Sequence, residues 1–527
     1  MRYVSTTVLM MEAVMTKRMD NLLVAQHTVA QGAFDQAMKL SVGRGITLSA
    51  EQTAASKYVL FQSGCLAVWE GHAGSGKTTS LRVVADAYRL DGYKVIGCSK
   101  AALAAGKLQE ETGIESSTID ALVRDIDNGK VRLTKRSVIF LDEAGMADTT
   151  SAARIVQHVE AAGAKIILAG DRQQIQPIGQ GGAFTYAAEK TVFNLTENHR
   201  QKKEQDRLDA LTFRKGTMTE IKAVLDRWKG EGRLSVQSTL SKAAVMAAED
   251  FVTAKDSEGN PLPYDKKILM AERRETVALM NDTIQKFRSR RGEVGDTYTL
   301  QVAPTESNDK KPQPVYETVR MAVGDRIAFC KNSTPKMGIV DPETGRKSSV
   351  KNGEKGVITD MRRDGEAWLM EARLDDGRKV AFRTDKYDRI NLGYGATIHK
   401  SQGQSVDQAF AVTERPDRHS QYVTQTRHRI HSKTYTTEAA EASLARASSR
   451  ENKAVLASEL VAAYRAKIDA QVAQRVEAIE AQRRAQEAKA AQEAEERGRK
   501  AQEAKKPVAE QAKAKRQQKG QELGFGM

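Results

Sequence analysis

Between residues 46 and 200 the chain alternates short apolar runs with longer amphipathic stretches. The apolar runs are LAVWEG, KVIGCS, SVIFLDE and KIILAGD, at residues 66–71, 94–99, 137–143 and 165–171. Strands that are buried on both faces of a parallel sheet have this near-continuous apolar character, and helices connect them. The pattern therefore predicts an α/β fold with a parallel sheet and crossover helices.

The pattern differs outside this region. Residues 1–45 and 201–250 are predicted to be mostly helical, and KKILMAERRETVALMNDTIQKFR (266–288) predicts a strand followed by a helix. Residues 300–390 are rich in Gly and Asp between short alternating segments, which predicts a small β-barrel insertion. The strand–loop–helix pattern returns at residues 391–437.

From residue 438 the sequence consists largely of Ala, Glu, Lys, Arg and Gln, and AQEA recurs at residues 485–488, 491–494 and 501–504. Helix propensity is high, but large apolar side chains are almost absent after residue 480. Because such a segment cannot bury a core, residues 438–527 are predicted to be a solvated helix or a disordered tail.

The net charge of the chain indicates what kind of partner it binds. The chain has 83 Lys and Arg against 68 Asp and Glu, which gives a formal net charge of +15. This surplus favours a polyanion, nucleic acid first, although the basic tail can carry much of it. Three cysteines without metal spacing favour a reducing, cytoplasmic compartment. No apolar run is long enough to span a bilayer, so membrane insertion is not expected.

The strongest chemical signal is GHAGSGKT at residues 71–78, between a predicted strand and a predicted helix. Glycines let backbone amides curl round phosphates, and the helix N-terminus adds partial positive charge. Lys77 is predicted to reach the β- and γ-phosphates, and Thr78 to hold magnesium (Mg2+). A Gly-rich turn without function is the alternative. The predicted ATP-binding residues of this loop are Gly71, His72, Ala73, Gly74, Ser75, Gly76, Lys77, Thr78 and Thr79.

Two further strand ends carry candidate catalytic groups. SVIFLDEAGM places Asp142 to bind magnesium and Glu143 to orient or deprotonate the attacking water. KIILAGDRQQ places Gln174 three residues after Asp171, where an uncharged amide can sense the γ-phosphate. Ordinary solvated strand ends are the alternative for both. Together with the phosphate loop, the two segments predict hydrolysis of a nucleoside triphosphate rather than binding alone.

These segments and several downstream ones resemble, in order and spacing, the motifs of superfamily 1 helicases across residues 46–434. GDRQQIQP resembles the third motif and LTENHRQ the fourth, which makes Arg200 an arginine finger. GYGATIHKSQGQSVDQAF resembles the fifth motif of the RecD-like branch, and QYVTQTRHR the sixth, with Arg427 as a second finger. LSAEQTAA resembles the upstream glutamine motif, in which Gln52 reads the adenine edge.

Within that branch the sequence is most similar to the conjugative relaxase–helicases of the TraA type (Ti-plasmid-like). LDEAGM, AGAKIILAGD and YVTQTRHR carry the resemblance, and RYVSTTVLMMEAVM is similar to the segment that follows their nicking domain. The sequence has neither an HxHxH-like cluster nor an N-terminal tyrosine pair, so relaxase activity is not expected. Gln425, where a small residue is usual, puts the geometry around Arg427 in doubt.

The resemblance implies that ATP and Mg2+ bind between two RecA-like P-loop NTPase domains, with 5′-to-3′ movement on single-stranded DNA. The implied catalytic residues are Lys77, Glu143, Gln174, Arg200 and Arg427. The implied organisation is a helical N-terminal segment (1–45), a first RecA-like domain (46–200), a helical region that begins the second RecA-like domain (201–299), a small SH3-like β-barrel insertion (300–390), the remainder of the second domain (391–437) and the tail (438–527).

Three segments resemble DNA-contacting motifs: GCSKAALAA (97–105), SSTIDAL (116–122) and the fifth motif. Their hydroxyls and basic groups suit backbone phosphates. Ser and Thr before a helix also act as caps, which is the alternative for residues 116–118. The predicted DNA-binding residues are Ser99, Lys100, Ser117, Thr118, Thr397, His399 and Lys400.

The sequence therefore predicts an ATP-dependent DNA helicase or translocase of conjugative plasmid transfer that lacks the nicking domain. A separate relaxase and the conjugative secretion or coupling machinery are the implied partners. A RecD-like repair helicase, a non-catalytic DNA-binding remnant and a phosphotransferase kinase are the alternatives. The opening segment and the tail favour conjugation, and the complete catalytic set argues against a remnant. The adjacent Asp142 and Glu143 are not needed by a kinase.

Overall fold

The computed structural model describes residues 5–177, 181–306, 313–451 and 455–462, with scattered positions between 466 and 515. The chain divides into two units, Met1–Ala457 and Ser458–Met527. The predicted tail begins with helix α15 (Glu438–Ser449), and most of its remaining sequence lies outside the described residues. None of the helices in the described ranges has both the length and the apolar character that a membrane crossing requires.

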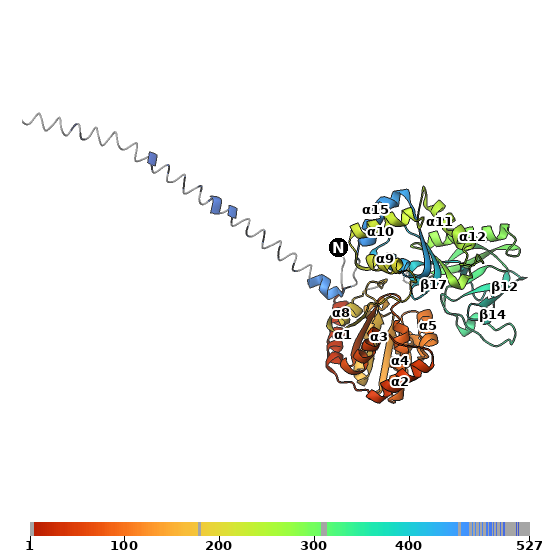
Figure 1. Cartoon of the computed structure of the whole chain (residues 1–527), viewed down its shortest axis with the longest axis horizontal. Helices are drawn as coiled ribbons and strands as arrows, with labels where there is room; N and C mark the ends of the chain where they lie inside the picture. Colours follow the sequence, from red (N-terminus) through yellow and green to blue (C-terminus); the bar gives the residue numbers. More distant parts are fainter. Residues whose placement is uncertain are drawn as a thin grey trace, which may run out of the picture. The chain divides into compact units, whose positions relative to one another are not determined.

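Six parallel strands form the first sheet, in the order β3-β2-β4-β5-β1-β6 (Figure 1). The four strands predicted from the apolar runs are all present and occupy its centre. The sequence does not predict β3 and β6, because three residues are too few for a hydrophobic pattern. The strands are β1 (Leu66–Gly71), β2 (Lys94–Ser99), β3 (Ser116–Thr118), β4 (Ser137–Asp142), β5 (Lys165–Gly170) and β6 (Phe193–Leu195).

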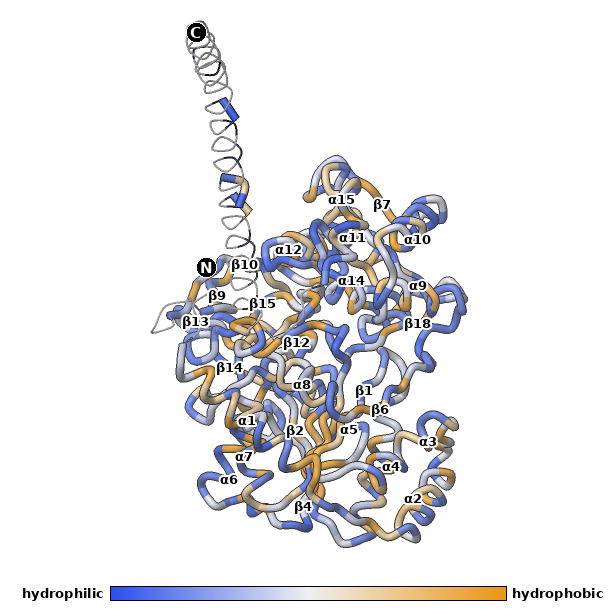
Figure 2. The backbone as a smooth tube through the Cα atoms, turned by 90° about the vertical axis from the view of Figure 1, so that its left-hand side faces the viewer, coloured by the Kyte–Doolittle hydropathy of each residue, from blue (hydrophilic) through white to orange (hydrophobic). Residues whose placement is uncertain are grey.

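Helices cover both faces of this sheet, because strand side chains point alternately to opposite faces. Val68 of β1 lies in one core with Met19 of α1, whereas Trp69 lies in the other with Leu81 of α4. Trp69 is fully buried, and these strands are among the most hydrophobic parts of the backbone in Figure 2. The helices are α1 (Thr6–Val24), α2 (Gln31–Gly43), α3 (Ala50–Lys57), α4 (Lys77–Leu90), α5 (Ala102–Thr112), α6 (Ile119–Asp127), α7 (Thr149–Ala162) and α8 (Ala183–Lys190).

A second parallel sheet has five strands in the order β16-β8-β17-β18-β7. It confirms the predicted strand and helix at residues 266–288. Residues 201–250 are mostly helical, as predicted, but the sequence does not predict β7, a short half-buried edge strand between two helices. The strands are β7 (Leu234–Gln237), β8 (Lys267–Ala271), β16 (Gly395–Thr397), β17 (Val406–Val412) and β18 (His428–Thr437), and the helices are α9 (Glu204–Lys215), α10 (Met218–Gly230), α11 (Leu240–Thr253), α12 (Arg274–Arg290), α13 (Ile398–Ser401) and α14 (Arg418–Gln425).

Antiparallel strands between α12 and β16 form the predicted β-insertion. A hairpin of β9 and β10 precedes a five-stranded sheet in the order β14-β13-β12-β11-β15. Trp368 of β13 packs on Tyr298 of β9, with ring centroids 4.6 Å apart, so the hairpin and the five-stranded sheet are in contact. The strands are β9 (Thr297–Glu306), β10 (Pro314–Ala322), β11 (Arg326–Phe329), β12 (Lys355–Asp364), β13 (Ala367–Leu374), β14 (Lys379–Arg383) and β15 (Ile390–Leu392).

Candidate nucleotide site and nucleic-acid interface

A single cavity of about 2640 Å³ brings together residues of both parallel sheets and of the insertion. Of the predicted site residues, five do not line it: Gln52, Gly71, Ser99, Ser117 and Thr118. The predicted residues that line it are His72, Ala73, Gly74, Ser75, Gly76, Lys77, Thr78, Thr79, Lys100, Asp142, Glu143, Gln174, Arg200, Thr397, His399, Lys400 and Arg427.

The phosphate loop joins the end of β1 to the start of α4. Gly74 and Gly76 have φ angles of 85° and 73°, a left-handed conformation that glycine adopts without strain. The Lys77 ammonium donates to the carbonyl oxygens of Gly71 (3.0 Å) and Gly170 (3.3 Å), which lie at the ends of β1 and β5. Within the part of the chain that the structure describes, the buried hydroxyl oxygen of Ser75 has no hydrogen-bond partner. This cradle fits a bound phosphate chain.

Gln52 lies behind the phosphate loop. Its side-chain amide donates to the carbonyl oxygen of Ser75 at 3.0 Å. Its amide oxygen accepts from the backbone N–H of Ser49, because Gln52 completes the capping box of α3. The side chain is 7% exposed. In this conformation Gln52 supports the phosphate loop, and its contact with adenine stays a prediction.

The end of β4 supplies two adjacent carboxylates. Burial, and next the charge of Glu143, raise the pKa of Asp142 to about 6. Thr78 lines the same cavity, and a hydroxyl with a carboxylate is a donor set that magnesium prefers. Asp142 and Thr78 therefore fit a Mg2+ ion bound with a nucleotide. Among the described residues, Glu143 is the one non-glycine residue with positive φ, at 51°.

The metal-free protein is expected to be stabilised at pH 8 by Asp142→Asn. The folded pKa of Asp142, about 6, exceeds the unfolded value of about 4, so the folded state binds this proton more tightly. The resulting stability is complete below the unfolded pKa and is lost as pH rises through the folded one. In EDTA the variant should have a higher urea midpoint than wild type at pH 8 and nearly the same midpoint at pH 4. An equal gain at both pH values would contradict this cause.

The two predicted arginine fingers donate to main-chain oxygens of α14 and of the loops next to it. Arg200 donates to the carbonyl oxygen of Thr426 at 2.6 Å. Arg427, which is 1% exposed, donates to the carbonyl oxygens of Val423 (2.9 Å) and Gln404 (3.1 Å). Burial, and next the charge of Arg427, lower the pKa of Arg200 to about 9. Both guanidinium groups remain charged at neutral pH, in surroundings that favour an anion.

Two glutamines near these arginines have different roles. The amide oxygen of Gln174 is buried beside the cavity and has no partner among the described residues, which leaves an acceptor for a ligand or water. Gln425 instead donates to the Thr434 hydroxyl at 3.0 Å and accepts from the Ser432 hydroxyl at 3.4 Å. Its bulk is accommodated by hydrogen bonds to β18. Gln425 therefore does not displace Arg427, which still lines the cavity.

A buried polar cluster beneath the phosphate loop joins the two sheets. Arg214 of α9 contacts Asp171 at 3.0 Å and Glu70 at 3.4 Å. The Tyr422 hydroxyl of α14 donates to Asp171 at 3.2 Å and accepts from the Ala73 N–H at 3.0 Å. Sequence reasoning missed this cluster. The only signal was Glu70 in an apolar run, whereas Arg214 and Tyr422 lie in ordinary helical patterns.

Arg214→Met is expected to lower the free energy of unfolding by about 3 kcal/mol at pH 7, because it leaves the Asp171 carboxylate buried without its cation. Burial raises the pKa of Asp171, but the charges of Arg214 and Lys77 and a hydrogen bond from the Gln173 N–H together outweigh that effect and keep the pKa below its usual value. The stabilisation by the Arg214–Asp171 pair is present above the unfolded-state pKa of Asp171 and is lost as pH falls through its folded-state pKa. Urea titration at pH 3 should therefore show a smaller decrease in the free energy of unfolding than at pH 7. Arg154→Met is the control. Arg154 contacts Asp127 at 3.3 Å, but both side chains are about half-exposed, so the pair should contribute less than about 1 kcal/mol.

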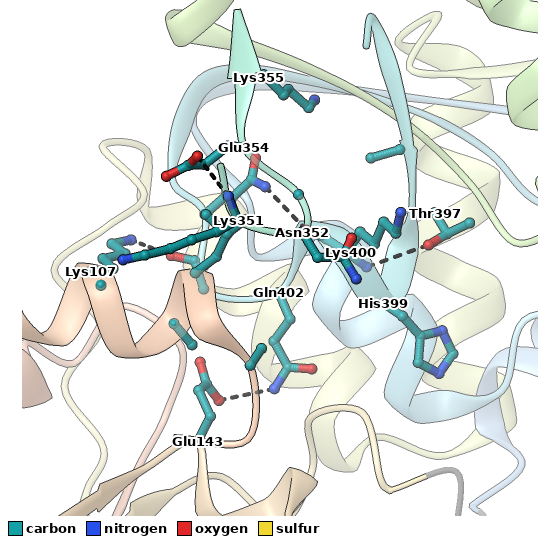
Figure 3. Close-up of a pocket in the computed structure, with 18 of the residues that line it drawn as sticks. Lys107, Glu143, Lys351, Asn352, Glu354, Lys355, Thr397, His399, Lys400 and Gln402 are labelled. Atoms are coloured by element: carbon teal, nitrogen blue, oxygen red, sulfur yellow. Dashed lines mark hydrogen bonds between the residues drawn. The ribbon is translucent and has the colours of Figure 1, made fainter. Parts of the chain in front are cut away.

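The predicted DNA-binding residues fall into two groups. Ser99 is buried, and the Thr118 hydroxyl accepts from the Ala121 N–H as the N-cap of α6, so capping accounts for Thr118. Lys100 is paired with Asp148 at 2.7 Å. Thr397 caps the short helix α13, on which His399 and Lys400 are exposed beside the cavity (Figure 3).

Further lysines reach the same cavity from the insertion and from α5. Lys351 and Lys355 come from the insertion, and Lys107 from α5 (Figure 3). Burial lowers the pKa of Lys355 to about 8. The sequence predicts the insertion at residues 300–390 but no role for these lysines, since nothing local shows that they line a cavity with α5. Together with Lys400 they give the cavity opening cationic groups that suit a polyanion.

Known proteins resemble this chain in sequence and fold. The family model described as an AAA domain matches residues 47–239. The probable conjugal transfer protein TraA of Sinorhizobium fredii is 30% identical over 405 residues, which are 76% of this chain and 33% of that protein. The ATP-dependent RecD2 DNA helicase of Deinococcus radiodurans is 28% identical over 141 residues, 26% of this chain and 20% of that protein.

Among solved structures, that of Bacteroides Pif1 bound to ssDNA aligns with a TM-score of 0.48 and 15% identity, and covers 74% of this chain and 92% of that one. The chain spans about a third of the length of the curated TraA proteins that it matches, 33% for the Sinorhizobium protein.

Proposed function

We propose that this chain, a distant homologue of conjugal transfer protein TraA with an AAA-type ATPase domain, is an ATP-dependent helicase that moves along single-stranded DNA. One observation carries the proposal. The phosphate loop, the carboxylate pair and the two arginines line one cavity, and lysines from three separate segments line it as well. Such a site can couple the charge of a nucleotide to contacts with a nucleic-acid backbone.

In this proposal the amides of the phosphate loop and Lys77 bind the β- and γ-phosphates. Mg2+ held by Thr78 and Asp142 would supply positive charge at the phosphate oxygens. Water attacks the γ-phosphorus, Glu143 accepts its proton, and the bond from that phosphorus to the bridging oxygen breaks to release ADP and phosphate. Gln174 orients the γ-phosphate, which completes the chemistry of the first sheet.

Arg200 and Arg427 stabilise the charge that develops on the transferred group, as arginine fingers do. Arg427 precedes a strand of the second sheet, whereas the phosphate loop follows a strand of the first. Turnover would therefore require both sheets to contribute at once. Opening and closing of this contact with each ATP would move lysines such as Lys400 relative to Lys107, and with them the bound strand.

Homology supports conjugative DNA transfer in the cytoplasm as the setting, since TraA is named a conjugal transfer protein. A separate relaxase and the secretion or coupling machinery are the partners we propose. Movement in the 5′-to-3′ direction is proposed from the helicase resemblance. A repair helicase of the RecD type is the second candidate, because the RecD2 DNA helicase also matches part of the chain.

The test is ATP turnover by the purified chain with and without single-stranded DNA at fixed salt, with Lys77→Ala as the blank. We expect DNA to raise turnover about tenfold or more and Lys77→Ala to abolish it. Duplexes with a 5′ or a 3′ single-stranded tail then test direction. If the wild type and the Lys77 variant are equally inactive while DNA still binds, the helicase proposal fails and a non-catalytic remnant takes its place.

A further inference from the structure

A short segment after α13 contacts the catalytic edge of the first sheet. The side-chain amide of Gln402 donates to a carboxylate oxygen of Glu143 at 2.9 Å (Figure 3). On the next residue, the Gly403 carbonyl oxygen accepts a hydrogen bond from the Lys107 ammonium of α5. Two successive residues of the second sheet's loop therefore hold the first sheet's proposed general base and the adjacent helix.

We propose that Gln402 is a positioning residue that restrains Glu143 until DNA binds the preceding α13 segment. The inference rests on the proposed ATPase and names how DNA controls it. A carboxylate oxygen that accepts from Gln402 has less capacity to accept from the attacking water. Release of that hydrogen bond would free Glu143 for catalysis.

The local structure makes Gln402 suited to such a change. Its amide oxygen is buried and has no hydrogen-bond partner in the described ranges, so the restraining conformation leaves one polar atom unsatisfied. A buried acceptor without a hydrogen bond raises the free energy of this conformation. The free-energy difference between it and a conformation in which Gln402 turns away from Glu143 is therefore small. Gly403 has a φ angle of 77°, which lets the backbone turn tightly beside Glu143.

The same segment carries the exposed groups suited to DNA. His399 and Lys400 are exposed, lie within three residues of Gln402 and line the same cavity (Figure 3). Helix α13 has only four residues, from Ile398 to Ser401, so a displacement at Lys400 is passed directly to Gln402. A phosphate drawn to Lys400 would compete with the position that Gln402 takes against Glu143. The displacement of α13 by DNA would then also release Glu143 from Gln402.

The experiment compares ATP turnover with and without single-stranded DNA for wild type and Gln402→Met, which keeps the side-chain length but cannot donate. Turnover without DNA should rise about tenfold, the effect of removing one hydrogen bond to a carboxylate. Turnover with saturating DNA should stay near the wild-type value, so the stimulation ratio collapses. Gln408→Met is the matched control, since the Gln408 side chain of β17 also donates to a main-chain oxygen, that of Lys255 at 2.7 Å, but lies outside the cavity lining, and it should leave the ratio unchanged.

Two further variants keep the proposal testable if Gln402→Met does not fold. Gln402→Glu should act in the same direction, because like charges repel, and Lys107→Met should do so more weakly by loosening the contact at Gly403. Thermal melting establishes that each variant is folded. An unchanged ratio in the folded Gln402 variants, or an equal fall in both activities, overturns the restraint and leaves the helicase proposal intact. Absence of Lys77-dependent turnover in wild type overturns both, and it is seen before any Gln402 variant is compared.

Discussion

Glu143→Gln is expected to lower DNA-stimulated ATP turnover by about 10³-fold, within the range that a general base contributes. Glutamine has the same shape, so it keeps the side chain in place, but it cannot take the proton of the attacking water. Glu143 also has an unusual backbone, with a φ of 51°, and the substitution leaves that conformation as it is. ATP affinity, measured by titration with a fluorescent nucleotide, should change by less than about twofold, since the loss is confined to the transition state.

Glu110→Gln is the matched control for Glu143→Gln. Glu110 lines the same cavity but is exposed on α5, away from the strand end that carries Asp142. Its substitution removes one negative charge from the cavity wall and should leave turnover within about twofold of wild type. If both variants lose turnover to the same extent, the charge of the cavity and not proton transfer explains the effect, and Glu143 loses its assigned role.

The same residue gives a double-substitution test of the Gln402 restraint. If Gln402 acts only through Glu143, Gln402→Met has nothing to release in a Glu143→Gln background. The two substitutions should then be non-additive, as expected for side chains in direct contact. Additive effects would mean that Gln402 acts through a residue other than Glu143.

The parts of this site that sequence predicted are those built within one strand–loop–helix unit. Lys77 and Asp142 follow apolar strands directly, so their placement at one sheet edge needs only the parallel order of those strands. Gln52 was also placed near the loop, but whether it supports the loop or reads the base depends on its hydrogen bonds to Ser49 and Ser75. Motif spacing carries no information on that choice.

The contacts that sequence could not predict join distant residues. Gln402 and Glu143 are 259 positions apart, and Lys107 and Gly403 are 296 positions apart. No periodicity relates such pairs, because their meeting depends on how the second sheet's loops lie against the first. Strand β7 was missed for a related reason, since a four-residue edge strand is defined by its pairing with β18 rather than by its own composition.

Arg427→Lys is expected to lower DNA-stimulated ATP turnover by about 10³-fold or more, as loss of an arginine finger does. Lysine keeps the charge but not the planar fork that lets Arg427 donate to Val423, Gln404 and the Thr426 hydroxyl at once. The ammonium therefore cannot hold the same position next to Arg200. Nucleotide affinity should change little, because the phosphate loop of the first sheet supplies the main phosphate contacts.

Arg429→Lys separates this role from a general need for arginine near the cavity. Arg429 lines the same cavity two residues further on, but its side chain is 41% exposed and contacts Asp407 at 3.4 Å. Its substitution should leave turnover within about twofold of wild type. Because Arg427 is buried and bonded to main-chain oxygens, the urea midpoint of each variant must be measured with its turnover. A turnover loss in Arg427→Lys that tracks a lost fold would assign Arg427 to stability, whereas the loss in a fully folded variant assigns it to the ATP-bound contact between the two sheets.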